Sequence, residues 1–401
     1  MKFKIVAFQI IFLTFMVPFA ARAQESEKQS DFWAARDVVI DAKPKANKVR
    51  IGIWDSGVDI SLFKGRIALG VDKKILVRGY DSFKLRKDTP MEVLPKELLA
   101  RQDELNAVLK AFDDLDSNVD SPEARAFNDR QKKMTKSEQD ELEKAAGRWT
   151  GYVHGTGVAD IAVAGNNAAE IVIARMEWWH GSPPVPCWTK ELADREAESI
   201  KDSLAFLVRN GARVINMSWG RFERSYINNL KECAPTMTAE DRVALARYTV
   251  EKIRTVLQEG MKASSNVLFV GAAGNDSTTV ADANPATRFS LPNFILVGAV
   301  DRNGKAASFT NKGPEITLYA NGERVPACLP GGVTSYPSGT SMSTPNVANA
   351  AAKMLVFNPK LTGAKLRELL ESTADKNDAG LALLHTAKAV SAARTSAKAK
   401  K

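Results

Sequence analysis

Three side chains in this sequence have the types needed for nucleophilic catalysis. They are a carboxylate at Asp55, an imidazole at His154 and a hydroxyl at Ser341. A serine hydroxyl is a weak nucleophile at neutral pH, so it needs a base to take its proton and a carboxylate to orient that base. Since the three residues lie far apart in the chain, their joint use depends on a fold that brings them together.

The segment around Ser341 indicates the start of a helix. Residues 339–345 read Gly-Thr-Ser-Met-Ser-Thr-Pro. Gly339 allows close approach of a substrate backbone, and Pro345 is tolerated if the helix begins near Ser341, because the first turn has no amide partner to lose. Backbone amides and the positive end of the helix dipole would then favour an oxyanion there. A plain helix N-cap is the alternative, but it leaves the glycine and proline flanks unexplained.

The carboxylate and the imidazole both adjoin apolar segments. Asp55 follows directly on a run that ends at Trp54, where an ordinary Asp-Ser-Gly turn is the common alternative. His154 begins the stretch 154–160, which is followed by the small-residue run 161–164, and this run predicts a helix packed tightly against a sheet, with the imidazole near its first turn. An amide side chain at Asn275, after a further apolar run, could donate a hydrogen bond to an oxyanion.

The elements that would position these side chains have an α/β pattern. Five short runs rich in valine and isoleucine predict strands, and none alternates strictly, as expected of strands covered on both faces. Amphipathic helices are predicted between them, over 189–208 and 239–258. We therefore expect a doubly wound, mainly parallel sheet with helices on both faces and functional residues at the carboxyl ends of strands. The five runs are 49–54, 170–176, 214–218, 266–271 and 294–300.

One segment, residues 84–148, breaks this pattern because it is charged and helical in character with no strand signal. Ser121-Pro122-Glu123 predicts a fresh helix start, and Gly147 predicts a helix stop. We interpret the segment as a helical insertion packed on the main domain, which either gates a cleft or assists folding. Its apolar residues that share one helical face are Leu98, Leu105, Val108, Leu109, Phe112 and Leu115.

In these motifs and their order, the sequence resembles the subtilase family of serine peptidases over about residues 49–359. The resemblance implies a subtilisin-like fold and a triad in which Asp55 orients His154 and His154 takes the proton from Ser341. It also implies an oxyanion hole formed by the Asn275 side chain and the Ser341 amide. Residues 216–220 resemble the strand that pairs with substrate and borders the S1 pocket, which suggests Ser218, Trp219 and Gly220 as substrate-binding residues.

Three features depart from the family pattern. Gly157 and Asp160 occupy positions where subtilases usually have a histidine and a glycine. The stretch of chain between Asp55 and His154 is longer than in the compact bacterial subtilases, and the insertion accounts for the extra length. The segment between the predicted signal peptide and the catalytic domain, residues 24–48, is shorter than the inhibitory prodomain of many exported subtilases.

The resemblance implies an exported serine endopeptidase that cleaves protein or peptide substrates through an acyl-enzyme. The chemistry requires no cofactor, while structural calcium and side-chain preference cannot be inferred from the sequence. A catalytically silent subtilase scaffold that binds proteins is the main alternative, and ester hydrolysis by the same residues is another.

The start of the chain predicts a signal peptide over residues 1–23, with lysines, then an apolar run, then Ala-Arg-Ala. An uncleaved membrane anchor is the alternative, but the apolar run is short for a membrane span. We therefore expect export to the periplasm or the extracellular space and no stable membrane span. The remaining organisation is a short extension over 24–48, a catalytic domain over 49–390 and a basic tail over 391–401.

Charge and cysteine content complete the sequence-based expectations. The net charge of +9 resides largely in the predicted signal peptide and beyond Asp378, which leaves the body nearly neutral and argues against nucleic acid as a partner. In an oxidising compartment the three cysteines allow one disulfide. We favour Cys187 with Cys233, leaving Cys328 free, and three unpaired thiols are the alternative.

Overall fold

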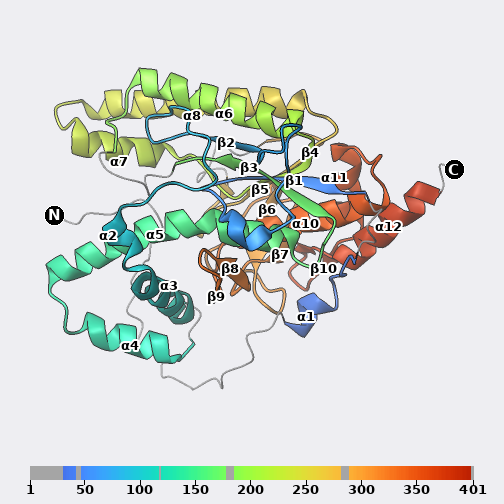
Figure 1. Ribbon diagram of the computed structural model, residues 1–401, viewed down its shortest axis with the longest axis horizontal. Helices are drawn as coiled ribbons and strands as arrows, with labels where there is room; N and C mark the ends of the chain where they lie inside the picture. Colours follow the sequence, from blue (N-terminus) through green and yellow to red (C-terminus); the bar gives the residue numbers. More distant parts are fainter. Residues whose placement is uncertain (1–29, 42–46, 117–118, 178–184, 281–288, 399–401) are drawn as a thin grey trace.

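A computed structural model describes residues 30–41, 47–116, 119–177, 185–280 and 289–398. Within these residues, nine strands form one sheet in the order β10-β11-β7-β6-β5-β4-β1-β3-β2, and β8 and β9 form a separate hairpin (Figure 1). Neighbouring strands of the large sheet are parallel, apart from the β10-β11 pair at one edge. The strands are β1 (Val49–Asp55), β2 (Val77–Gly79), β3 (Ala169–Arg175), β4 (Ala212–Met217), β5 (Leu268–Ala272), β6 (Phe294–Val300), β7 (Leu318–Asn321), β8 (Ala327–Leu329), β9 (Val333–Ser335), β10 (Asp375–Lys376) and β11 (Ala382–Leu383).

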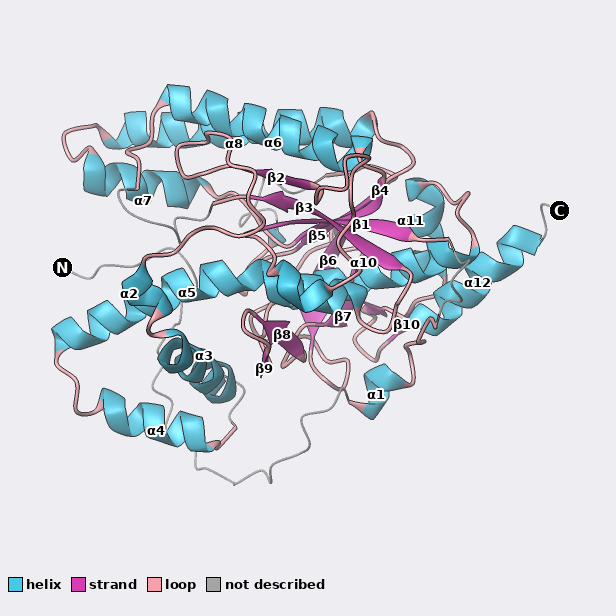
Figure 2. Cartoon of the chain, in the orientation of Figure 1, coloured by secondary structure: helices cyan, strands magenta, loops and turns pink. Residues whose placement is uncertain are grey.

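The five predicted strand segments are confirmed as β1, β3, β4, β5 and β6, which lie inside the sheet. Almost every side chain in them is buried, whichever face it points to. Because helices cover both faces of the sheet, residues that point to either face are buried, and apolar and polar residues need not alternate along these strands. The prediction of a doubly wound, mainly parallel α/β sheet is therefore confirmed (Figure 2).

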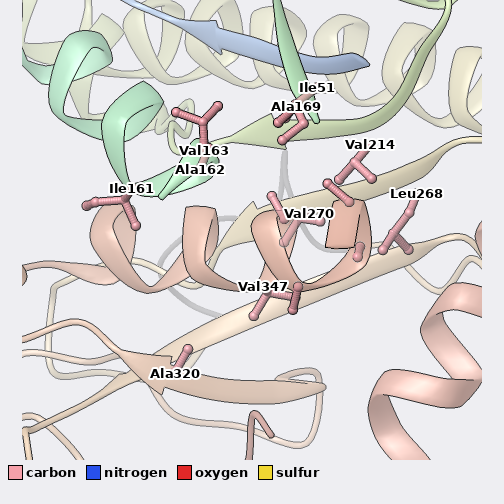
Figure 3. Close-up of a cluster of buried hydrophobic side chains, with 14 of the residues drawn as sticks. Ile51, Ile161, Ala162, Val163, Ala169, Val214, Leu268, Val270, Ala320 and Val347 are labelled. Atoms are coloured by element: carbon pink, nitrogen blue, oxygen red, sulfur yellow. The ribbon is translucent and has the colours of Figure 1, made fainter. Parts of the chain in front are cut away.

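Helices cover the two faces of the sheet in separate groups (Figure 1). One face packs against α6 and α8, with α7 beside them. The other face packs against α5, α10, α11 and α12, and Figure 3 shows Val347 of α10 among strand residues such as Val214 and Val270. The helices are α1 (Asp31–Ala34), α2 (Lys96–Leu99), α3 (Gln102–Asp116), α4 (Pro122–Gln131), α5 (Lys136–Val163), α6 (Lys190–Arg209), α7 (Glu223–Cys233), α8 (Ala239–Lys262), α10 (Thr340–Phe357), α11 (Gly363–Ser372) and α12 (Thr386–Lys398), with a short 3-10 helix, η1 (Ile60–Phe63).

Side-chain caps explain where several of these helices begin. Thr189 caps α6 by accepting from the amide of Leu192, and Thr238 caps α8 in the same way. Ser121 caps α4, with Pro122 as its first residue, as the sequence predicted. The predicted helices at 189–208 and 239–258 are thus confirmed with small shifts of their ends.

The predicted helix stop at Gly147 is wrong. A single helix, α5, runs from Lys136 to Val163, so His154 lies in its second half and not near a first turn. The true start is a capping box formed by Thr135 and Glu138. Burial of Trp149 and Val153 continues the apolar stripe through Gly147, and this packing outweighs the roughly 1 kcal/mol by which a glycine disfavours a helix.

Two further expectations concern the ends and the cysteines. Cys187 and Cys233 form a disulfide and Cys328 is free, which confirms the favoured pairing. None of the described helices combines the length and apolar character that a membrane crossing requires. The predicted signal peptide lies outside the described residues. The extension at 24–48 is described from residue 30 to 41, where Trp33 is buried and donates to the carbonyl of Asp301 at 3.1 Å.

Candidate active site

The candidate site lies where neighbouring parallel strands end. Asp55 is the last residue of β1, Ser218 directly follows β4, and Asn275 follows shortly after β5. Since β1, β4 and β5 are adjacent and parallel, their carboxyl ends lie together at one edge of the sheet. The fold thus brings these three predicted residues to a common edge, as expected for open α/β sheets.

Asp55 and His154 form the best-defined contact of the site. His154 Nδ1 lies 2.8 Å from Asp55 Oδ1, and both side chains are buried. The same carboxylate oxygen accepts from the amide of Ser56 at 2.7 Å, which fixes its orientation. A carboxylate in this position favours the imidazole tautomer with a proton on Nδ1, so Nε2 is the basic nitrogen.

Glycine at position 155 lets α5 approach the Asp55 turn. A Cβ atom there would lie 2.2 Å from the carbonyl oxygen of Gly57 and 3.0 Å from Asp55 Oδ1. The Gly155 amide also donates to Ser56 Oγ at 3.0 Å. Gly155 therefore allows the close approach of this helix to the end of β1.

Ser341 lies in the first turn of α10 and is 9% exposed. Its hydroxyl donates to the Ser218 carbonyl at 3.3 Å. Pro345 lies beyond the first turn, contrary to the expectation, and cannot donate to the Ser341 carbonyl four residues earlier. Instead, Ser218 Oγ donates to that carbonyl at 2.8 Å, and Asn216 Nδ2 supports Ser218 Oγ at 2.9 Å. A side chain after β4 thus replaces the missing bond of the helix.

The amide group of Asn275 is held in a defined orientation. Its Oδ1 accepts from both the backbone amide and the hydroxyl of Thr340, each at 2.8 Å. This leaves Nδ2 on the side of Gly339, where a Cβ atom would lie 3.3 Å from it. Gly339 has φ 152°, a region that favours glycine. Asn275 therefore presents a donor one residue from the start of α10 and close to Ser341.

The three predicted substrate-binding residues lie on the segment that leaves β4. Ser218 contacts Ser341 as described, while Trp219 packs edge-on against Trp54 and is 5% exposed. The carbonyl of Gly220 accepts from Arg221 Nη1 at 3.3 Å. The Trp219 side chain is therefore part of the core and offers little open surface for contact.

Buried charges beneath this segment were missed by sequence reasoning. Glu196 Oε1 accepts from Arg221 Nε at 2.8 Å, and its Oε2 accepts from the Tyr226 hydroxyl at 2.8 Å. Lys84 Nζ lies 3.5 Å from Glu196, which is 2% exposed. The signal in the sequence was a glutamate on the otherwise apolar stripe of α6, four residues from both Leu192 and Ile200. These contacts hold Arg221, and with it the adjoining residues 218–220, against α6.

Burial opposes ionisation of Glu196, but the charges of Lys84 and Arg221 and hydrogen bonds from Arg221 and Tyr226 outweigh it and lower its pKa to about 2. Its contribution to stability is therefore present above the ordinary pKa of 4.5 and is lost as pH falls from there towards 2. Glu196→Gln is expected to reduce the free energy of unfolding by about 3–5 kcal/mol at pH 7. In urea unfolding of both proteins, the difference should shrink below pH 4.5, and a difference independent of pH would contradict this assignment.

A second missed residue is Arg175, the partner of Asp55 in the register between β1 and β3. Its side chain is fully buried and donates to Glu92 at 2.8 Å and to the carbonyls of Lys87 and Thr89 at 2.9 and 3.0 Å. The adjoining Pro90 carbonyl accepts from the amide of Val58 at 2.8 Å. Arg175 thus fastens the start of the insertion over the Asp55 turn.

Among the described residues, no group of three or more histidine, cysteine, aspartate or glutamate side chains is arranged to hold a metal ion.

Comparison with solved structures supports the fold. A lanthipeptide protease aligns with a TM-score of 0.53 and 13% identity, covering 86% of this chain and 87% of its own. A structure of the subtilase cytotoxin SubAB assembly aligns with a TM-score of 0.52 and 17% identity, covering 88% of this chain and 92% of that chain. At such identities the likeness shows a shared fold and nothing more.

Comparison of sequences identifies the family. Subtilisin E of Bacillus subtilis is 29% identical over 228 residues, 56% of this chain and 51% of that protein. The thermostable alkaline protease of Halalkalibacterium halodurans is 30% identical over 225 residues, 55% of this chain and 52% of that protein. The match thus spans about half the length of these relatives. A model of the subtilase family, peptidase S8, matches residues 46–387. Since that match covers most of the chain, the protein belongs to the subtilase family.

Proposed function

We propose that this subtilase is a serine endopeptidase that hydrolyses peptide bonds with Asp55, His154 and Ser341. The observation that carries the proposal is the 2.8 Å contact between Asp55 Oδ1 and His154 Nδ1 in a buried position. It orients the imidazole and favours a proton on Nδ1, which makes Nε2 the basic nitrogen. Ser341 supplies the nucleophile at the start of α10, beside the Asn275 amide.

In the proposed reaction, His154 Nε2 takes the proton of Ser341 as its Oγ attacks the peptide carbonyl. The carbonyl oxygen becomes an oxyanion, to which Asn275 Nδ2 and the Ser341 amide donate hydrogen bonds. His154 then passes the proton to the leaving amine, and an acyl-enzyme on Ser341 remains. A water molecule, deprotonated by His154 Nε2, then attacks the ester carbonyl. The bond from the carbonyl carbon to Ser341 Oγ breaks, Oγ takes the proton back from His154, and the carboxylic acid product leaves. No step uses a cofactor.

Labelling by a peptidyl phosphonate tests this proposal directly. The wild-type protein should be labelled covalently at Ser341, and the Ser341→Ala variant should not. Circular dichroism of both proteins confirms that they are folded. A folded wild-type protein that takes no label at Ser341 would favour the alternative, a silent scaffold that binds proteins, while labelling with cleavage of esters only would favour an esterase.

Asn275→Ala is expected to lower kcat by about 10²–10³-fold, because one of two oxyanion donors is lost. KM for a peptide substrate should change little, since the donor acts mainly in the transition state. Steady-state kinetics on a chromogenic peptide measure both constants. Thr340 also loses its acceptor, so Asn275→Asp, which keeps the oxygen that Thr340 binds, is the matched variant; equal activity of Asn275→Asp and wild type would rule out a donor role.

We also propose that the protein is exported and acts on protein or peptide substrates outside the cytoplasm. The support is the order of charge, apolar run and small residues over 1–23, together with the disulfide between Cys187 and Cys233, which is typical of oxidising compartments. Sequencing of the mature protein from cell fractions should find Gln24 at its N-terminus in the periplasm or medium. A cytoplasmic protein that begins at residue 1 or 2 would contradict export.

A further inference from the structure

The helical insertion is connected both to the helix that carries His154 and to the segment that precedes Ser341. A separate apolar core joins Leu105 of α3, Phe127 of α4 and Trp149 of α5. It also includes Leu329, which belongs to β8 and not to the insertion. Because α5 continues from this core to His154, the insertion and the base share one helix (Figure 1).

The hairpin β8–β9 lies against α5 just beyond His154. The amide of Cys328 donates to Asp160 Oδ2 at 2.9 Å, and a Cβ atom on Gly157 would lie 3.3 Å from Leu329 Cδ2. The two positions that depart from the family pattern are therefore those that receive the hairpin. Gly157 leaves room for Leu329, and Asp160 binds the backbone of β8.

A buried ion pair links the insertion to the segment that leads to Ser341. Asp114 of α3, with its side chain 1% exposed, accepts from Arg324 Nη1 at 2.6 Å and from Lys110 Nζ at 3.0 Å. Burial alone would raise the pKa of Asp114, but hydrogen bonds from Ser121, Arg324 and Lys110 outweigh it and lower the pKa. The carboxylate is therefore ionised, and Arg324 is its partner from outside the insertion.

Arg324 is in turn bonded to the residues just before Ser341. Its amide donates to Ser338 Oγ at 3.0 Å, and the amide of Gly339 donates to the carbonyl of Gly322 at 2.7 Å. The amide of Val325 donates to the carbonyl of Pro337 at 3.1 Å. Three hydrogen bonds thus tie residues 322–325 to residues 337–339, which end two positions before Ser341.

We propose that Asp114 and Arg324 are positioning residues that set the place of Ser341 relative to His154 through the insertion. The inference rests on the proposed function for its catalytic meaning. It assigns the insertion a fixed supporting role, in place of a gate over the cleft. A gate must separate from the domain during turnover, and that movement would break the bond between Asp114 and Arg324 and leave Arg324 without this carboxylate.

The test replaces the pair by apolar residues, Asp114→Leu with Arg324→Met, so that no buried charge is left alone. The rate at which a small phosphonate phosphonylates Ser341 is expected to fall about 10- to 100-fold, since small errors in the placement of reacting groups have effects of this size. KM for a short peptide should change little. The single variant Arg324→Lys keeps the charge but lacks the planar guanidinium fork. It should retain part of the rate that the double variant loses.

The matched control is Glu104→Leu with Arg130→Met, an ion pair within the insertion that does not touch residues 322–339. This variant should retain the wild-type rate within about twofold, as expected for a surface pair. Amide hydrogen exchange of residues 322–339, measured by mass spectrometry, should quicken in the first variant and not in the control.

Unchanged exchange together with an unchanged phosphonylation rate in the Asp114→Leu, Arg324→Met protein would overturn the proposal. A loss confined to large protein substrates would also overturn it and indicate a gate. If wild-type protein is not labelled at Ser341, the proposed function fails, yet the exchange experiment still decides whether the insertion holds this segment.

Discussion

Replacing Ser341 with alanine is expected to lower kcat by about 10⁶-fold, the size of loss known for the same replacement in subtilisin itself. Without the hydroxyl, His154 has no group to deprotonate for attack and no acyl-enzyme forms. The carbonyl of Ser341, which accepts from Ser218 Oγ, remains in place, so the fold should be kept. Steady-state hydrolysis of a chromogenic peptide measures the loss.

Ser343→Ala is the matched control for this prediction. It removes a buried hydroxyl from the same helix, one that donates only to the carbonyl of Thr340 at 2.9 Å. Its activity should stay close to that of the wild type. A Ser341→Ala protein with more than a trace of activity, after removal of contaminating protease, would show that another residue is the nucleophile.

Asp55→Asn is expected to lower kcat by about 10⁴-fold at neutral pH, the typical effect of removing the charge from a triad carboxylate. The oxygen of asparagine can still accept from Ser56, so the turn should hold its shape. The variant lacks the negative charge that stabilises the imidazolium formed when His154 takes the proton. Because substrate does not contact Asp55, KM should change much less than kcat, as measured by steady-state kinetics.

Asp72→Asn provides the control, because Asp72 is an exposed carboxylate in a turn that accepts only from residues of that turn. Its kcat should equal that of the wild type. An Asp55→Asn protein that is folded and retains a tenth or more of the wild-type kcat would argue that the contact of Asp55 with His154 is structural, with another group polarising the base.

The sequence predicted the sheet well because strands buried on both faces leave a local pattern. The run at 294–300, for example, is apolar throughout and corresponds to β6, and the run at 49–54, apolar apart from Arg50, corresponds closely to β1. The site could be predicted for a related reason. Asp55 and Ser341 each lie at an element boundary, where glycine and small polar residues mark a turn.

The errors and omissions arose from contacts between distant segments. The helix around His154 continues through Gly147 because Trp149 is buried against α3, where its Nε1 donates to Asn106 at 2.8 Å. The charges of Glu196 and Arg221 find each other only in the folded chain. Helix propensity holds no information on such pairs, so the partners of Glu196 could not be predicted from its place on the apolar stripe of α6.

The continuity of α5 also limits how this protein can be shortened. A deletion that removed the insertion up to and including Gly147 would make Arg148 the first residue of the helix. No capping side chain would then precede it. The deletion would also uncover Trp149 and Val153, which are now 0% and 3% exposed. A shortened version of the protein would therefore need a new N-cap before His154 and polar residues at positions 149 and 153. The insertion thus cannot be removed by a single deletion without these further changes.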